Sequence, residues 1–226
     1  LFSIIGHDLR NPLGGITQLL TMIEDGDVEL TDTSMISEMR RQGQAALEIL
    51  NSLLQWGKTQ LKGIKPEPTQ FDAAKVVDLT LEALSKQISD KALTVDQQIQ
   101  PGLRVTGDQN HFDFILRNLI SNAIKFSPPD GRILIEGFLD VQKVIFSVND
   151  QGKGLSTEQQ DKFEHSDLEV TYGTQGEKGT GIGLSLSKEF VRANKGHIWL
   201  SSSAEHGTTF YFYFGVPESQ LASIPL

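Results

Sequence analysis

The sequence predicts an α-helical hairpin followed by an α/β sandwich, in which helices cover one face of a mixed β-sheet. Three observations support this fold class. Apolar residues recur at spacings of three and four through about the first 60 residues, as they do on packed helices. A glycine- and proline-containing stretch, Gly63 to Pro68, then interrupts the pattern. Beyond it, helical segments are interleaved with short β-type segments, which indicates helices packed on a sheet.

The composition sets the number of domains and excludes some partners. A chain of 226 residues can form two small domains, and we expect them at residues 1–65 and 66–226. Its 20 Lys and Arg stand against 29 Asp and Glu, which gives a formal net charge of -9. Nucleic acid and anionic membranes both need a basic face, so neither is expected as a main partner.

The sequence also indicates a cellular compartment. It contains no cysteine, which excludes disulfides and thiolate metal sites and fits a reducing compartment, the cytoplasm. No apolar run reaches the length of about 18 residues that a membrane span needs, so no membrane contact is expected within this stretch. Because the chain opens on Leu1 and not on Met, we interpret it as a fragment whose upstream part is a sensor or a membrane anchor.

Two helices are expected before the break at residue 63. The first runs from residue 1 to about residue 25, and its apolar stripe is Ile5, Leu9, Leu13, Ile16, Leu20 and Ile23. The second begins near Thr31 to Ser34, and its seam is Ile36, Met39, Gly43, Ala46, Leu50, Leu53 and Gly57. A single hairpin cannot bury both stripes, so we predict that two copies associate as a four-helix bundle.

A polar group lies opposite the apolar stripe of the first helix. His7 faces away from the stripe, with Asn11 one turn further along and Gly14 leaving the next turn bare. Pro12 lacks an N–H, so a kink is expected near His7. Asp8 can hold one imidazole nitrogen and leave the other free as a nucleophile. An isolated surface histidine usually has no function, so the surrounding residues carry the interpretation.

The second part predicts a regular series of elements. We expect helices at residues 73–91, 108–126 and 184–193. Strands are expected on either side of Pro101-Gly102 and at residues 133–138, 144–148, 197–201 and 208–214. Residues 155–178 are polar, contain glycine and show no periodicity, so they are expected to form a mobile loop.

One predicted helix carries a polar stripe suited to a metal and a phosphate. Asn118, Asn122 and Lys125 lie at positions i, i+4 and i+7, on a single face. Asparagine oxygens are neutral donors that can complete the shell of a Mg²⁺ whose negative ligands are phosphates, and the lysine adds a positive charge for those phosphates. Taken alone, such a stripe is more often a solvated helix face.

Two glycine-rich segments complete the candidate pocket. Asp150, with Gly152 and Gly154, follows a hydrophobic strand, where a carboxylate can accept the adenine amino group while the glycines let backbone approach the base. A second segment opens a helix whose bare N–H groups can bind an anion; it contains Gly179, Gly181, Gly183 and Leu184. A dinucleotide-binding fold is the rival interpretation, but its glycine fingerprint follows a strand and has a different spacing.

In this order, the segments resemble the sensor histidine kinases of two-component systems. Residues 7–12, His-Asp-Leu-Arg-Asn-Pro, resemble the H box, and residues 118–126 resemble the N box. Residues 150–154 and 179–184 resemble the G1 and G2 boxes, and Gly207 to Phe210 resembles the closing glycine-threonine turn with Thr208. The resemblance implies a dimerisation and phosphoacceptor hairpin followed by a Bergerat-type ATPase domain.

The resemblance also implies an activity. An ATP-dependent protein-histidine kinase would phosphorylate His7 and pass the group to an aspartate of a response regulator receiver domain. Asp8 would orient and deprotonate the imidazole, Asn11 would place a water for the reverse phosphatase reaction, and Asp150 would read adenine. ATP and Mg²⁺ are the implied cofactors, with Asn118 and Asn122 as metal ligands, and a homodimer is the implied assembly.

One segment departs from the family pattern. The lid between the glycine boxes normally carries two phenylalanines and an arginine, whereas here only Phe163 is clear, and Ser166 and Leu168 stand at the other two places. Lys178 is our candidate to replace part of the arginine's role at the γ-phosphate. The altered lid favours an alternative, a nucleotide-binding signalling scaffold with weak or no kinase activity. A second rival is an ATPase of the same fold that drives clamp closure and needs no acceptor histidine.

Overall fold

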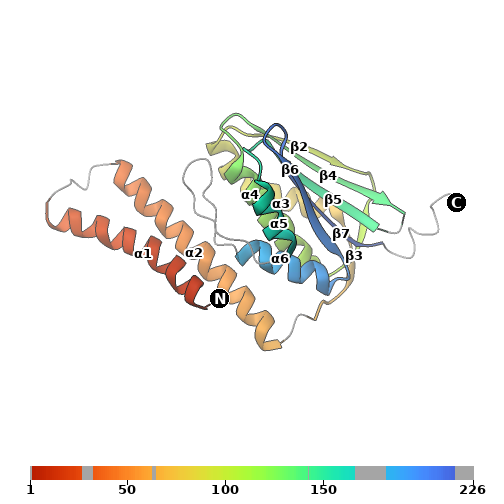
Figure 1. Ribbon diagram of the computed structural model, residues 1–226, viewed down its shortest axis with the longest axis horizontal. Coiled ribbons are helices and arrows are strands. Elements are labelled where there is room, and N and C mark those ends of the chain that lie inside the picture. The colour runs from red at the N-terminus through yellow and green to blue at the C-terminus, as the bar shows by residue number, and fades with distance from the viewer. Residues whose placement is uncertain (1, 27–32, 63–64, 142, 166–181, 217–226) are drawn as a thin grey trace. The chain divides into compact units, whose positions relative to one another are not determined.

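The computed structural model describes residues 2–26, 33–62, 65–141, 143–165 and 182–216. The chain divides into two compact units, Leu1–Gly63 and Ile64–Leu226 (Figure 1). The first is a helical hairpin and the second is a mixed sheet with helices, so the predicted fold class is confirmed. None of the helices in the described ranges is long and apolar enough to cross a membrane.

The hairpin consists of α1 (Phe2–Glu24) and α2 (Thr33–Lys62). Helix α1 runs through Pro12 and ends before Gly26, whose backbone has a φ of 77°. The two helices pack closely at two glycines. A Cβ added at Gly15 would lie 3.3 Å from the side chain of Gln42, and one added at Gly43 would lie 3.9 Å from Ile16 Cδ1. The helices expected from the apolar spacing are therefore present, and they pack against each other.

Much of the apolar surface of the hairpin remains exposed in a single chain. Ala46 in the predicted seam is buried, but two other seam residues, Ile36 and Leu50, are exposed. Six large apolar side chains of the hairpin are between 40% and 58% exposed, namely Leu13, Leu20, Ile36, Leu47, Leu50 and Leu54. One hairpin thus leaves uncovered the kind of surface that helix bundles bury.

The second unit is built on a seven-stranded sheet. Its strands are β1 (Thr69–Asp72), β2 (Thr94–Ile99), β3 (Arg104–Gly107), β4 (Arg132–Asp140), β5 (Lys143–Asp150), β6 (His197–Ser203) and β7 (Gly207–Gly215). They run in the order β1-β3-β7-β5-β4-β2, and β6 also pairs with β7. The β2–β4 pair is parallel and the other pairs are antiparallel, which makes the sheet mixed as predicted.

The helices α3 (Ala73–Asp90), α4 (Gln109–Phe126) and α6 (Ile182–Ala193) cover one face of this sheet (Figure 1). Phe112 of α4 is fully buried at the centre of the layer between helices and sheet. Its ring lies within 5.6 Å, between centroids, of four other rings, those of Phe71, Phe146, Phe212 and Phe214. This aromatic cluster fixes α4, the helix with the polar stripe, against the sheet.

Asp108 determines where α4 begins. Its carboxylate accepts hydrogen bonds from the backbone N–H groups of Asn110 (2.9 Å) and His111 (3.1 Å), as an N-cap does. It also accepts the N–H of Glu67 at 2.9 Å, which ties the segment after the hairpin to the start of α4. Burial alone would raise the pKa of Asp108, but these backbone hydrogen bonds hold it below its ordinary value.

The structure corrects the prediction of an unstructured loop at residues 155–178. Residues Thr157–His165 form a helix, α5. Ser156 caps it reciprocally: the N–H of Gln159 donates to Ser156 Oγ (3.3 Å), and the N–H of Ser156 donates to Gln159 Oε1 (3.0 Å). This is a capping box, and Phe163 anchors the helix by burial. The rest of the predicted loop, residues 166–178, lies outside the described residues.

Candidate functional site

The polar stripe of α4 lies at the edge of the helix layer. Asn118, Asn122 and Lys125 are all half-buried, whereas Phe112 and Leu119, on the neighbouring face of the helix, are fully buried. The side-chain ammonium of Lys125 lies 5.3 Å from the centre of the Phe126 ring. The three polar residues are therefore brought together on one face, as their spacing predicts.

The amide of Asn118 contacts the first turns of α6. Its Nδ2 donates a hydrogen bond of 3.0 Å to the hydroxyl of Ser187, which is fully buried. Its Oδ1 lies against Gly183, where an added Cβ would overlap that oxygen and lie 2.9 Å from Asn118 Cγ. Leu184, the next residue of the predicted set, is half-buried on the same helix. The packing of α4 on α6 thus brings Asn118 of the stripe against Gly183 in the first turn of α6.

Asp150 ends β5 and is only 4% exposed. Its Oδ1 accepts the backbone N–H groups of Gly152 (2.8 Å) and Thr208 (3.3 Å). Burial raises the pKa of this carboxyl to about 6, and the two backbone hydrogen bonds oppose part of that rise. A carboxylate with both backbone bonds on one oxygen keeps its second oxygen for another donor.

The turn after β5 fits tightly between α4 and β6. A Cβ at Gly152 would lie 2.8 Å from the carbonyl oxygen of Phe126, the last residue of α4. Gly154 has a φ of 72°, and a Cβ there would lie 2.7 Å from the backbone carbon of Ser203. Both glycines are therefore required by close backbone approach, as expected for a segment that lines a pocket.

A serine that the sequence reasoning missed connects this turn to β7. Ser202 Oγ accepts the N–H of Leu155 (2.8 Å), donates to the carbonyl of Gly207 (3.0 Å) and lies 2.9 Å from Thr208 Oγ1. Ser202 and Thr208 are cross-strand partners in the β6–β7 register, and only that pairing brings them together. The segment that leads into α5 is therefore tied to β7, the strand whose Thr208 N–H donates a hydrogen bond to Asp150.

The first lid aromatic packs inward. Phe163 is 1% exposed, and its ring meets that of Phe210 edge-on at 5.6 Å. The ammonium of Lys188 on α6 lies 4.2 Å from the Phe163 ring centre and donates to the Phe163 carbonyl. Five other lid and glycine-box residues of the sequence analysis lie outside the described residues: Ser166, Leu168, Lys178, Gly179 and Gly181.

The residues present fit a Mg²⁺ held together with nucleotide phosphates. Asn118 and Asn122 offer neutral amide oxygens, and Asn118 Oδ1 lies at the first turn of α6, where a helix N-terminus favours an anion. Across the described part of the chain, no group of three or more His, Cys, Asp or Glu could hold a metal ion. Such a donor set suits an ion whose charge is balanced by its ligand's phosphates.

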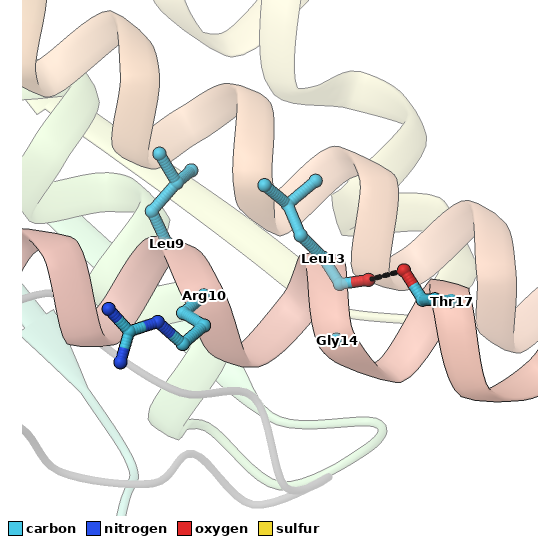
Figure 2. A pocket seen from close by; sticks show the side chains of 5 residues that line it. All are labelled: Leu9, Arg10, Leu13, Gly14 and Thr17. Carbon is cyan, nitrogen blue, oxygen red and sulfur yellow. Dashed lines mark hydrogen bonds between the residues drawn. The ribbon is translucent and has the colours of Figure 1, made fainter.

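His7 and Asp8 lie on α1, and their side chains lie outside the described residues. Asn11, one turn further along, is exposed. On the same helix, a shallow hollow is lined by Leu9, Arg10, Leu13, Gly14 and Thr17 (Figure 2). A Cβ at Gly14 would meet nothing within 4 Å, and the hydroxyl of Thr17 donates to the Leu13 carbonyl at 2.9 Å. The surface around Gly14 is therefore open to a partner.

Two family models match this chain. The His Kinase A (phospho-acceptor) domain matches residues 1–61, and the histidine kinase-, DNA gyrase B- and HSP90-like ATPase matches residues 107–218. Together they match most of the chain, in the order of the hairpin and the sheet unit described above. The chain belongs to the sensor histidine kinases of two-component systems.

Curated relatives of this family match nearly the full chain. Adaptive-response sensory kinase SasA from Trichormus variabilis is 30% identical over 233 residues, covering 94% of this chain and 56% of the relative. Circadian input-output histidine kinase CikA from Synechococcus elongatus is 28% identical, covering 97% of this chain and 30% of the relative. Hybrid signal transduction histidine kinase B from Dictyostelium discoideum is also 28% identical, and the chain spans 12% of its length.

Solved structures show the same fold. The histidine kinase AdeS of Acinetobacter baumannii has a TM-score of 0.74 at 22% identity, covering 94% of this chain and 98% of that one. The catalytic domain of histidine kinase ThkA has a TM-score of 0.58 at 26% identity, covering 66% of this chain and 96% of that domain.

Proposed function

We propose that this chain is the catalytic part of an ATP-dependent protein-histidine kinase that phosphorylates His7 and passes the group to an aspartate of a response regulator. The observation that supports it most is that one chain combines a phospho-acceptor hairpin with a buried carboxylate and an asparagine stripe suited to ATP. In the proposed division, residues 1–65 carry the acceptor and the dimer contacts, and residues 66–226 bind ATP.

In the proposed binding mode, Asp150 accepts the adenine amino group, and Gly152, Gly154 and Thr208 form the surrounding wall. The phosphates are taken by the first turn of α6, with Gly183 and Leu184, and by Gly179 and Gly181 of the glycine segment that precedes it in the sequence, with Lys125 adding a positive charge. Asn118 and Asn122 would hold Mg²⁺, which when bound neutralises charge on the transferred phosphate. The roles of these side chains are to bind and orient, which is most of what phosphoryl transfer requires of a protein.

The proposed transfer uses one imidazole nitrogen as the nucleophile. Nε2 of His7 forms a bond to the γ-phosphorus while the bond from that phosphorus to the bridging oxygen breaks, and ADP leaves with the electron pair. Asp8 accepts a hydrogen bond from Nδ1, orients the ring and takes up the proton as the ring becomes substituted. The phosphoryl group then passes to a receiver-domain aspartate, and the open surface around Gly14 of α1 is where we place that partner.

We further propose that the chain acts as a homodimer in the cytoplasm. Six apolar side chains of the hairpin are at least 40% exposed in a single chain, and a second hairpin in a four-helix bundle would cover them. The absence of cysteine fits a reducing compartment.

Labelling with γ-labelled ATP tests the function. We expect the chain to acquire label that is labile in acid and stable in alkali, the chemical signature of a phosphohistidine. A signalling scaffold, which the altered lid sequence favours, would bind ATP and acquire no label. A clamp-type ATPase of the same fold would release labelled phosphate without labelling itself, and the match of residues 1–61 to the phospho-acceptor domain argues against it.

Asn11→Ala is expected to lower the rate of regulator dephosphorylation by about 100-fold or more, the lower end of the range for a positioned group that assists proton transfer, while autophosphorylation changes little. Asn11 is exposed on α1 one turn from His7, so it can hold a water without being the nucleophile. Both rates are measured with the purified regulator. Gln18→Ala, two turns further along α1, is the control. An equal loss of both rates would mean that Asn11 supports the acceptor geometry.

Lys178→Ala is expected to weaken ATP binding more than ADP binding, because ATP alone presents the γ-phosphate charge that we assign to Lys178. Titration calorimetry with the two nucleotides measures the difference, and Lys86→Ala, an exposed lysine on α3, is the control. If ATP and ADP lose affinity equally, or if neither does, Lys178 has no role at the γ-phosphate.

A further inference from the structure

The two amide atoms of Asn118 have different environments, and two residues one turn apart on α6 create them. Gly183 and Ser187 are four residues apart, so both face α4. Ser187 accepts the amide N–H at 3.0 Å, and Gly183 provides the space in which the amide oxygen lies. Together they form a notch in α6 that receives the end of one side chain from α4.

We infer that Ser187 is a positioning residue that sets which atom of the Asn118 amide faces the nucleotide phosphates and their metal. This inference rests on the proposed function and deepens it. An asparagine can serve a cation only through its oxygen, since its NH₂ group is a donor with two positive hydrogens. By holding the NH₂ group, Ser187 keeps the oxygen at the first turn of α6.

The burial of Ser187 strengthens the argument. Its hydroxyl is fully buried between two helices, where solvent cannot replace a missing partner of the amide. Removal of the hydroxyl leaves the Asn118 NH₂ group without this acceptor and leaves the amide free to rotate. Groups that orient a metal ligand in this way typically change metal affinity by 10–100-fold when they are removed.

The test uses the whole chain and measures binding, not turnover. Titration calorimetry is carried out with ATP in the presence of Mg²⁺ and again with ATP in EDTA. Ser187→Ala is expected to weaken binding of Mg·ATP by about 10-fold and to leave binding of metal-free ATP unchanged. Ser187→Cys, which keeps the side-chain shape with a somewhat larger atom but is a poor acceptor, is expected to act in the same direction.

Ser147→Ala is the matched control. Ser147 is also fully buried and makes one side-chain hydrogen bond, to Glu136 Oε2 at 3.0 Å, but it lies on β5 away from the notch. Its replacement is expected to leave both affinities unchanged. The double variant Asn118→Ala/Ser187→Ala is expected to bind Mg·ATP as weakly as Asn118→Ala alone, because Ser187 acts through Asn118.

The outcomes separate this inference from the proposed function. If the unaltered chain binds no ATP, both fail. If it binds Mg·ATP and Ser187→Ala binds it equally well, the inference alone fails. It also fails if Ser187→Ala weakens Mg·ATP and metal-free ATP to the same extent, or if the two substitutions have additive effects, because either result gives Ser187 a structural role only.

Discussion

His7→Gln is expected to remove autophosphorylation completely while ATP binding persists. Glutamine keeps a polar side chain of similar length on α1 but has no lone pair that can attack phosphorus, so the reaction loses its nucleophile. The residues proposed to bind ATP lie in the other unit of the chain, in residues 64–226, so the substitution should not alter them. Labelling with γ-labelled ATP measures the first effect, and titration calorimetry measures the second.

The chain offers a matched control for this substitution. It has five histidines, and His206 is an exposed one in the turn between β6 and β7, where its Nδ1 lies 3.2 Å from Ser203 Oγ. His206→Gln is expected to be labelled as strongly as the unaltered chain. Appreciable acid-labile label on His7→Gln would mean that the acceptor is another residue, and loss of ATP affinity in that variant would mean that the substitution acts through folding.

Local signals were sufficient to predict most elements of the fold. The apolar spacing predicted both hairpin helices, and Asp108 marked the start of α4. The capping box of Ser156 and Gln159 is equally local, so α5 could have been predicted from it. The helix was not predicted because the segment is polar and shows no apolar periodicity. By contrast, β1 is a four-residue strand that exists through its pairing with β3, and four residues show too little periodicity to predict a strand.

The candidate site was predictable wherever its residues share one element. Helical spacing alone placed Asn118, Asn122 and Lys125 on one face of α4, because the period of a helix fixes that geometry. Ser187 and Ser202 were missed, since their roles arise from contacts between α6 and α4 and between neighbouring strands. A serine in a helix or strand has no sequence signal for such a contact, so only the folded chain reveals it.

Asp150→Asn is expected to reduce affinity for adenine nucleotides by about 100-fold or more, because a lost charged hydrogen bond and a buried unpaired donor each cost about 1–3 kcal/mol. The structure gives the reason that the amide cannot avoid this cost by rotating. The backbone N–H groups of Gly152 and Thr208 both donate to one oxygen of Asp150. The amide oxygen of the variant must therefore stay at that position, which turns its NH₂ group toward the place where adenine also presents a donor.

The same carboxyl gives a pH dependence with a defined sign. Because burial raises the pKa of Asp150 to about 6, a falling pH protonates it and removes the charged acceptor. Affinity for adenosine, which carries no titrating phosphate, should therefore decrease as the pH falls through about 6 in the unaltered chain. Asp150→Asn should show no such step. A pH-independent adenosine affinity in the unaltered chain would exclude Asp150 from the adenine site.

As the pH falls through about 6, the stability contributed by Asp150 should rise, whereas the affinity for adenosine should fall. A carboxyl whose pKa is higher in the folded than in the unfolded chain favours folding at low pH, and this contribution is lost as the pH rises from about 4 to about 6. At pH 7 the ionised Asp150 therefore opposes folding. Asp150→Asn removes that charge, so the free energy of unfolding at pH 7 should be unchanged or raised by up to about 2 kcal/mol.

Urea unfolding at pH 7 and pH 4 measures this difference, which should vanish at the lower pH because Asp150 is then neutral in the folded chain. Asp140→Asn, at the exposed end of β4, is the control and should alter neither stability nor nucleotide binding. If Asp150→Asn lost stability at pH 7 together with affinity, the carboxylate would be a structural group. Loss of binding with retained or increased stability is instead the result expected of a charge that is buried for its ligand.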